Sequence, residues 1–241
     1  MTDQTMLTQQ QLSFWDKNGY LVVEKVVPEW LMEKMNAYMD SLINGEIQLK
    51  DSPEGRTGTM QGHLYDSFIM EMSSFDPIPD MLADLLGGEA VICQSMYFTK
   101  GSQARIHQDE FFFRTNPPST TGLWMALQDV TAEHGPLVVI PGSHKGPQIH
   151  AEDLSGRWWQ DPKYRNELSD KTEEIADLSK LISVEMNAGD VLFFHGSTIH
   201  GGGPVASPDL ERRSYVCHYH RADSVLDPSN NRVELPPVPL R

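Results

Sequence analysis

The sequence predicts a mainly β protein with flanking helices, organised as a jelly roll. Apolar residues recur at helical spacing in the first 88 residues, whereas residues 89–241 hold many short β-type runs separated by turn residues. Strands that follow segregated helices are typical of a jelly roll with helices at its flank. The 241 residues, 39% of them hydrophobic, suffice for one such core. We therefore expect a single domain over 1–241, with N-terminal helices (1–88) packed on a jelly-roll core (89–241).

The first 88 residues contain several dipeptides that typically end helices. Apolar side chains at helical spacing follow Pro28, which suits the first turn of a helix. The dipeptides that end the expected helices are Asn18-Gly19, Asn44-Gly45 and Gly87-Gly88. The expected elements are a helix over 9–16, a strand over 20–27, a helix from 28 to about 44, a loop over 45–62 and a helix over 77–86.

Short β-type runs dominate the remainder of the chain. We expect strands over 90–98, 105–113, 121–130, 137–140, 181–186, 191–194 and 214–220. Residues 146–180 interrupt this series with a polar insert that contains Trp158-Trp159. Such an insert is expected to be partly helical and to cover a functional site.

Charge and composition exclude several classes of partner. The net charge is −15, so the surface repels nucleic-acid phosphates and anionic membranes. No apolar run is long enough to cross a bilayer, and the polar N-terminus has no signal-peptide core. Cys93 and Cys217 lie in apolar runs and are expected to be buried, reduced thiols. We expect a cytoplasmic protein, monomer or homodimer, that acts on a small molecule.

A set of metal-binding side chains is the most specific chemical signal. On a strand, His107 and Asp109 would point to the same side and could chelate one ion. Such a pair is common by chance, so the third ligand matters; His195 and His200 both follow the apolar run 191–194. Two imidazoles and one carboxylate on one side of Fe(II) leave open coordination positions, as in non-haem oxygenases.

An ordered series of motifs resembles the phytanoyl-CoA dioxygenase family of Fe(II)- and 2-oxoglutarate-dependent oxygenases. The matching motifs are His107-Gln108-Asp109, residues 123–127, residues 134–144, residues 189–196, His200-Gly201 and residues 212–219. The resemblance implies a double-stranded β-helix of the cupin-like type, with iron held by His107, Asp109 and His200. It also implies 2-oxoglutarate as co-substrate and O2 as oxidant.

The same resemblance implies a set of co-substrate contacts. Arg212 and Arg213 compete to bind the distal carboxylate of 2-oxoglutarate, because alternation allows only one of them to face inward. Counting back from Cys217-His218-Tyr219 favours Arg212. Further contacts are expected from Trp124, Gln94, Met96 and Ser214.

The expected reaction is hydroxylation of a small cytoplasmic metabolite, with succinate and CO2 as co-products. The carboxylate of Asp109 favours hydroxylation over halogenation. A residue at this position that did not bind iron would leave a coordination position free for a halide. No basic patch suited to coenzyme A is evident. Candidate substrate contacts are Met60, His63, Tyr65, Phe111, Phe113, Arg114, Trp158 and Arg221. The alternatives are a non-catalytic metal-binding jelly roll and a structural protein whose histidines are satisfied in the core.

Overall fold

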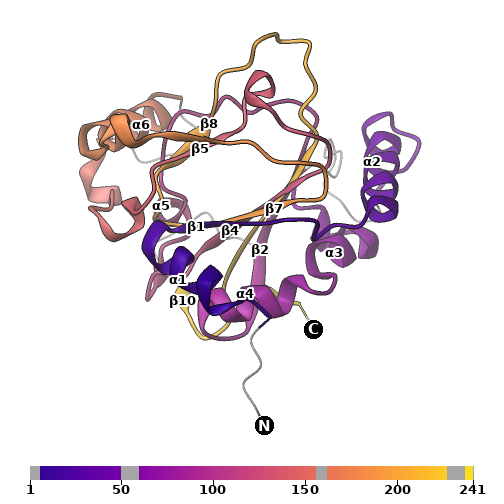
Figure 1. The fold of residues 1–241 in the computed structure, drawn as a ribbon, viewed down its shortest axis with the longest axis horizontal. Coiled ribbons are helices and arrows are strands. Elements are labelled where there is room, and N and C mark those ends of the chain that lie inside the picture. The colour runs from indigo at the N-terminus through magenta and orange to yellow at the C-terminus, as the bar shows by residue number, and fades with distance from the viewer. Residues whose placement is uncertain (1–5, 50–59, 156–161, 227–236, 241) are drawn as a thin grey trace.

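The computed structural model describes residues 6–49, 60–155, 162–226 and 237–240. Antiparallel strands form a six-stranded sheet in the order β1-β7-β4-β9-β2-β11 and a three-stranded sheet in the order β6-β5-β8. The larger sheet contains β1 (Tyr20–Val23), β2 (Ala90–Phe98), β4 (Thr121–Ala126), β7 (Val191–His195), β9 (Ser214–Arg221) and β11 (Val238–Pro239). The smaller sheet contains β5 (Leu137–Val139), β6 (Ile182–Val184) and β8 (His200–Gly202), and β3 (Thr115–Asn116) pairs with β10 (Val225–Leu226). The two sheets face one another, so the expected jelly roll is confirmed (Figure 1).

Helices pack on the outer face of the larger sheet, as Figure 1 shows. They are α1 (Gln9–Asn18), α2 (Glu29–Ile43), α3 (Ser67–Ser74) and α4 (Ile78–Leu86). Helix α1 begins at a capping box between Thr8 and Gln11 and ends at Gly19, whose φ of 73° suits glycine. Helix α3 is an element that the sequence patterns did not predict; the side chain of Asp66 caps it by accepting a hydrogen bond from the Ile69 amide at 2.9 Å.

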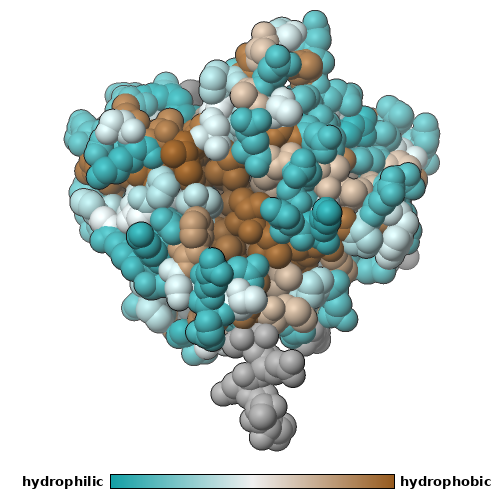
Figure 2. All heavy atoms as spheres, viewed as in Figure 1, coloured by the Kyte–Doolittle hydropathy of each residue, from teal (hydrophilic) through white to brown (hydrophobic). Residues whose placement is uncertain are grey.

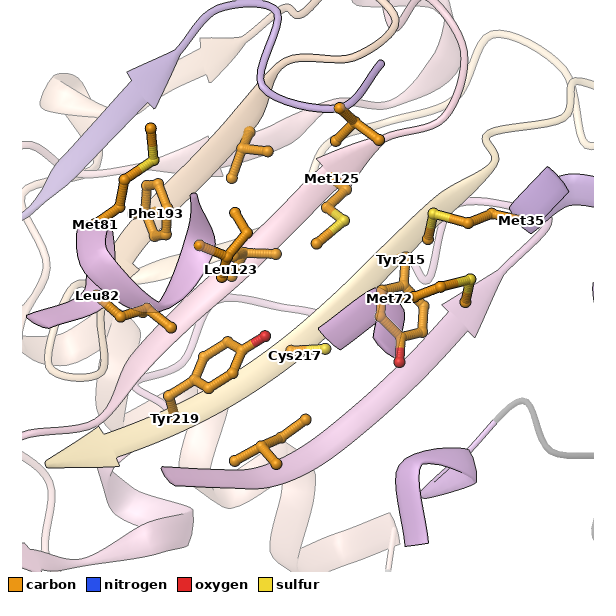
Figure 3. Packing of buried hydrophobic residues seen from close by; sticks show 14 of the residues in the cluster. Met35, Met72, Met81, Leu82, Leu123, Met125, Phe193, Tyr215, Cys217 and Tyr219 are labelled. Atoms are coloured by element: carbon orange, nitrogen blue, oxygen red, sulfur yellow. The ribbon is translucent and has the colours of Figure 1, made fainter. Parts of the chain in front are cut away.

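The main hydrophobic core lies between these helices and the larger sheet. Alternate residues of β4 and β9 point toward the helices, among them Leu123, Tyr215 and Tyr219. Figure 3 shows them beside Met35, Met72 and other side chains of the helices. The same face contains Cys217; both cysteines are free and buried, as expected.

A second apolar cluster fills the space between the two sheets. The larger sheet contributes Trp124, Leu192, Phe194 and Val216, which face Val139 and other residues of the smaller sheet. Figure 2 shows apolar residues in the centre of this view, surrounded by hydrophilic residues. Polar side chains that join this interior form the site described below.

The prediction of a strand over 105–113 was wrong. His107 makes only an isolated bridge with His200, in which the two backbones exchange hydrogen bonds of 2.9 and 3.0 Å. The chain then turns into α5 (Glu110–Phe113), with the Phe112 amide donating to the Asp109 carbonyl at 2.7 Å. The buried Glu110 carboxylate stabilises this turn by accepting hydrogen bonds from the amides of Thr115 and Thr120.

The insert is partly helical, as expected. It contains α6 (Pro162–Ile175), and Phe111 of α5 packs with Tyr164 and Leu168 of that helix. Trp158 lies outside the described residues. No helix in the described ranges is both long and apolar enough to span a membrane.

Candidate metal centre

His107, Asp109 and His200 converge between the two sheets. One potential ligand atom from each residue lies within 4.8 Å of the others. The Nε2 atom of His107 is 3.4 Å from Oδ1 of Asp109, and Nε2 of His200 is 3.4 Å from Oδ2. Among the described residues, this is the group of histidine, cysteine and acidic side chains with the spacing of a metal site. Two imidazoles and one carboxylate are the donor set of non-haem Fe(II) sites with open positions.

Backbone carbonyls orient both imidazoles. Nδ1 of His107 is 2.7 Å from the Arg105 carbonyl, and Nδ1 of His200 is 2.9 Å from the Thr198 carbonyl. A carbonyl oxygen only accepts, so Nδ1 carries a proton in each ring and Nε2 is the nitrogen that a metal would bind. This tautomer is the one a metal ligand needs, and the carbonyl contact holds the ring in place.

Burial and mutual contacts set the charges of the three side chains. Burial lowers the pKa of His200 to about 4, so its imidazole is neutral at physiological pH. Burial alone would raise the pKa of Asp109, but the imidazoles of His200, His218 and His107 outweigh it and hold this pKa well below its ordinary value. The site therefore offers a neutral His200 imidazole and a carboxylate anion, the forms that bind a divalent cation.

His195 does not join this group. Its ring lies 6.2 Å from Trp15 and 5.5 Å from His144, and its Nδ1 accepts a hydrogen bond from the Ser197 amide. Burial lowers the pKa of His195 to about 4, which keeps the ring neutral against α1. Of the two histidines that the sequence left in competition, only His200 faces His107 and Asp109.

Arg212 is a buried cation two residues before β9, on the same side as the site-facing residues of that strand. Its side chain is 2% exposed, and it lies over the Trp124 ring at 5.6 Å. Nη1 donates to the Gly135 carbonyl, whereas Nε has no partner in the described part of the chain. Burial lowers the pKa of Arg212 to about 10, so the guanidinium remains charged at neutral pH. No described carboxylate pairs with Arg212, although a buried charge is normally paired.

Arg213 points to the opposite side of the sheet. Its Nη1 donates to both carboxylate oxygens of Asp40 on α2 at 2.8 and 2.9 Å, and its Nε donates to Glu211 at 3.0 Å. These hydrogen bonds raise the pKa of Arg213 above its ordinary value. The two arginines therefore have separate environments, as strand alternation requires.

The other expected co-substrate contacts share the interior face of the larger sheet. In the pairing of β2 with β9, Gln94 lies opposite His218 and Met96 lies opposite Val216. In the pairing of β4 with β9, Trp124 lies opposite Val216. Ser214 is fully buried, and its hydroxyl has no hydrogen-bond partner among the described residues. Arg212, which lies over the Trp124 ring, and Ser214 thus each leave a polar atom without a hydrogen-bond partner among the described residues.

The expected substrate contacts are dispersed. Phe113 lies at the site, with its ring 5.1 Å from that of His218. Phe111 instead packs under α6, and Arg114 is held against it, donating from Nε to the Phe111 carbonyl at 3.3 Å. Met60 bridges to Met96 at the sheet edge, and Tyr65 is half-buried in the turn that follows.

His63 and Arg221 face away from the site. His63 bonds through Nδ1 to Ser95 Oγ at 2.8 Å, and Ser95 belongs to the helix-facing side with Tyr215. Arg221 pairs with Asp223 and lies beside Gly88 at the end of α4. Both residues were expected among the substrate contacts; the structure places Arg221 at the end of β9 with its odd-numbered, helix-facing residues, and His63 in the segment before α3, against that same face.

Two residues at the site were missed in the sequence. His218 is buried, and its Nε2 lies 2.7 Å from Oδ2 of Asp109. Gln108, between the two ligands, donates to the carbonyls of Pro147 and Ser197 and accepts from the Ile149 amide. The signal for His218 was present, since it follows Arg212 and Ser214 at even spacing on one face of β9.

Comparison with known proteins gives consistent results. The model of the family described as Phytanoyl-CoA dioxygenase matches residues 15–214. Phytanoyl-CoA dioxygenase from Arabidopsis thaliana is 27% identical, over 97% of this chain and 95% of that protein.

Solved structures share the fold. The non-haem alpha ketoglutarate dependent carbocyclase SnoK from nogalamycin biosynthesis superposes with a TM-score of 0.72 at 22% identity, over 98% of this chain and 94% of its own. EctD from S. alaskensis, solved with 2-oxoglutarate and 5-hydroxyectoine, superposes with a TM-score of 0.69 at 20% identity, over 94% of this chain and 80% of its own. EctD has also been solved with bound Fe.

Proposed function

Because the chain belongs to the phytanoyl-CoA dioxygenase family, we propose that it is an Fe(II)- and 2-oxoglutarate-dependent dioxygenase that hydroxylates a small molecule. The observation that carries this proposal is the convergence of His107, Asp109 and His200 to within 4.8 Å, with both imidazoles in the ligand tautomer. These side chains would hold iron. With iron and 2-oxoglutarate bound, O2 would supply one oxygen atom to a substrate C–H bond and one to succinate, with release of CO2.

The environment of Arg212 fits a dicarboxylate co-substrate. A buried guanidinium with an unpartnered Nε is stabilised by a carboxylate, and the Ser214 hydroxyl offers a further donor nearby in the sequence. The Trp124 ring beneath Arg212 supplies an apolar wall. We assign Arg212 to the distal carboxylate of 2-oxoglutarate, and Trp124, Ser214, Gln94 and Met96 to the walls of its site.

The presence of Asp109 supports hydroxylation over halogenation. With iron bound, its carboxylate would take the position that a halide needs. Phe113 is the side chain of the expected substrate set that lies beside the site, so we assign it to the wall of the substrate pocket.

The charges of the protein favour a small substrate over a coenzyme A ester. Coenzyme A carries several phosphate charges, whereas the protein has a net charge of −15. Near the site, the cation Arg105 already pairs with Asp170 and Glu173 of α6 at 2.7 Å each. A small polar or amphiphilic metabolite meets less repulsion. We further propose a cytoplasmic monomer or homodimer; its free, buried cysteines suit a reducing compartment.

A turnover experiment tests the proposal. The purified protein is loaded with Fe(II) and incubated with 2-oxoglutarate, ¹⁸O2 and two panels, one of small polar and amphiphilic metabolites and one of acyl-CoA esters. We expect succinate above that of the Asp109→Ala variant, together with a product from the first panel that gains one ¹⁸O atom.

The outcomes separate the competing functions. Labelled product from the acyl-CoA panel alone would keep the enzyme class and overturn the substrate proposal. Iron binding without succinate from either panel would instead indicate a non-catalytic metal-binding protein.

A further inference from the structure

The contact between His218 and Asp109 extends the site beyond its three expected ligands. We propose that His218 is a positioning residue that occupies one oxygen of Asp109, so that this carboxylate binds iron through its other oxygen only. The inference rests on the proposed function, because it assumes that His107, Asp109 and His200 bind iron.

The two carboxylate oxygens of Asp109 have different surroundings. Oδ2 lies 2.7 Å from Nε2 of His218, which is the length of a strong hydrogen bond. Each oxygen also lies 3.4 Å from one ligand nitrogen, Oδ1 from Nε2 of His107 and Oδ2 from Nε2 of His200, so the contact with His218 is what distinguishes them. An ionised carboxylate only accepts, so Nε2 of His218 carries the proton and donates it to Oδ2. This hydrogen bond uses one lone pair of Oδ2, whereas Oδ1 accepts no hydrogen bond from His218 and is the oxygen that we assign to the iron.

The surroundings of His218 fix its ring in this role. The side chain is 3% exposed and comes from the middle of β9, which is paired on both sides. The Phe113 ring lies 5.1 Å away at an interplanar angle of 33°. Because Nε2 is protonated toward Asp109, its lone pair is unavailable to iron, so His218 differs from His107 and His200.

The number of oxygens that Asp109 contributes decides whether O2 can bind. Two imidazoles and one carboxylate oxygen leave one triangular face of an octahedral iron open. A chelating 2-oxoglutarate would take two corners of that face and leave one for O2. If both oxygens of Asp109 bound iron, the co-substrate would fill every remaining corner. His218 thus preserves the corner that the reaction needs.

Two amide substitutions at one position isolate this hydrogen bond. The amide nitrogen of glutamine reaches about as far along the side chain as Nε2 of histidine, whereas that of asparagine stops near Nδ1. His218→Gln therefore retains a donor to Oδ2 and His218→Asn loses it, with similar polarity. His220→Asn is the matched control. His220 is also buried on the same face of β9, but its Nδ1 contacts the Arg221 carbonyl and its Nε2 has no hydrogen-bond partner in the described part of the chain.

The experiment uses nitric oxide as a stable substitute for O2, detected by electron paramagnetic resonance of its complex with Fe(II). Each protein is titrated with Fe(II), then exposed anaerobically to nitric oxide before and after saturation with 2-oxoglutarate. We expect all four proteins to give the signal before 2-oxoglutarate is added. After addition, the signal should persist in wild type, His218→Gln and His220→Asn, and fall by about fivefold or more in His218→Asn.

Each remaining outcome overturns a defined statement. A His218→Asn signal that matches wild type after 2-oxoglutarate is added overturns the positioning role. Loss of Fe(II) binding by His218→Asn also overturns it, because His218 would then act on metal affinity rather than on the open corner. Failure of wild type itself to bind Fe(II) or 2-oxoglutarate overturns the proposed function, and the role of His218 with it.

Discussion

Phe194 of β7 fills the space that Gly122 of β4 leaves open beside it. The two residues are paired in register, and a Cβ added to Gly122 would lie 2.1 Å from Cζ of Phe194. The Phe194 ring also lies 4.5 Å from the ring of His200. The missing side chain of Gly122 therefore lets an aromatic ring support one of the proposed iron ligands.

Gly122→Ala should displace the Phe194 ring and weaken the metal centre. Overpacking of a buried site costs about 1–3 kcal/mol, and we expect a comparable loss in the free energy of unfolding of the metal-free protein. Fe(II) affinity should fall as well, because His200 loses its support. Urea unfolding and Fe(II) titration measure the two effects. The double variant Gly122→Ala/Phe194→Leu should recover part of the stability and part of the Fe(II) affinity. If it recovers neither, the clash with the Phe194 ring is not the cause of the losses.

Arg212→Ala should weaken 2-oxoglutarate binding, whereas Arg213→Ala should not. A charge-assisted contact contributes about 1.5–3 kcal/mol, so the dissociation constant should rise by about tenfold to a hundredfold. Arg213 pairs with Asp40 at a partly exposed position just before β9, so its loss should cost only about 0–1 kcal/mol of stability. Calorimetric titration of the iron-loaded proteins measures the constants. A larger effect from Arg213→Ala would contradict the assignment.

Gln108→Leu should destabilise the segment that carries His107 and Asp109. Gln108 is 1% exposed, and its removal leaves the Pro147 and Ser197 carbonyls and the Ile149 amide without their partner. We expect a loss of about 2–3 kcal/mol in the free energy of unfolding, since buried polar groups would lose their hydrogen bonds.

Gln128→Leu is the matched control for this substitution. Gln128 also bonds to backbone groups, accepting from the Arg213 amide and donating to the Glu211 carbonyl, but it lies closer to solvent. Water can replace its contacts, so we expect a loss under about 1 kcal/mol. Urea unfolding measures both variants. An equal loss in the free energy of unfolding would contradict the prediction that the buried hydrogen bonds of Gln108 stabilise this segment more than those of Gln128.

His63 should make the metal-free protein less stable in acid. Burial lowers the pKa of His63 to about 4, whereas the unfolded chain titrates near the ordinary value of 6.5. The unfolded state therefore binds more protons between these pH values, and the free energy of unfolding falls as pH decreases from about 6.5 to about 4. His63 should contribute on the order of 2 kcal/mol to the loss between pH 6.5 and pH 4.5.

The variant His63→Asn isolates this contribution. Asparagine can keep a polar contact with Ser95 but does not titrate. Urea unfolding at the two pH values should show a smaller loss in the variant than in wild type, while His195 continues to contribute its own part. An identical loss in the two proteins would contradict the prediction. Fe(II) binding should be unchanged, since His63 faces the helices.

Local signals in the sequence predicted most elements and the metal-binding residues in particular. Thr8 and Gly19 bound α1 because a cap side chain and a left-handed glycine act on neighbouring backbone atoms. Neighbouring side chains of an extended segment face opposite sides of the sheet. This alternation separates Arg212 from Arg213 once it is known which face of the sheet is interior. The order of short motifs was enough to name His107, Asp109 and His200 together.

Tertiary structure decided the contacts that join distant segments. His107 and Asp109 meet because a bridge to His200 and a helical turn bring them together, rather than because they alternate on a strand. Arg213 turns outward to Asp40, and His218 reaches Asp109 across 109 positions of sequence. Local propensity acts through atoms a few residues apart, whereas these contacts depend on how the whole chain closes its loops and stacks its sheets. The sequence therefore determined which side chains could bind the metal, and the folded chain decided which groups hold them in place.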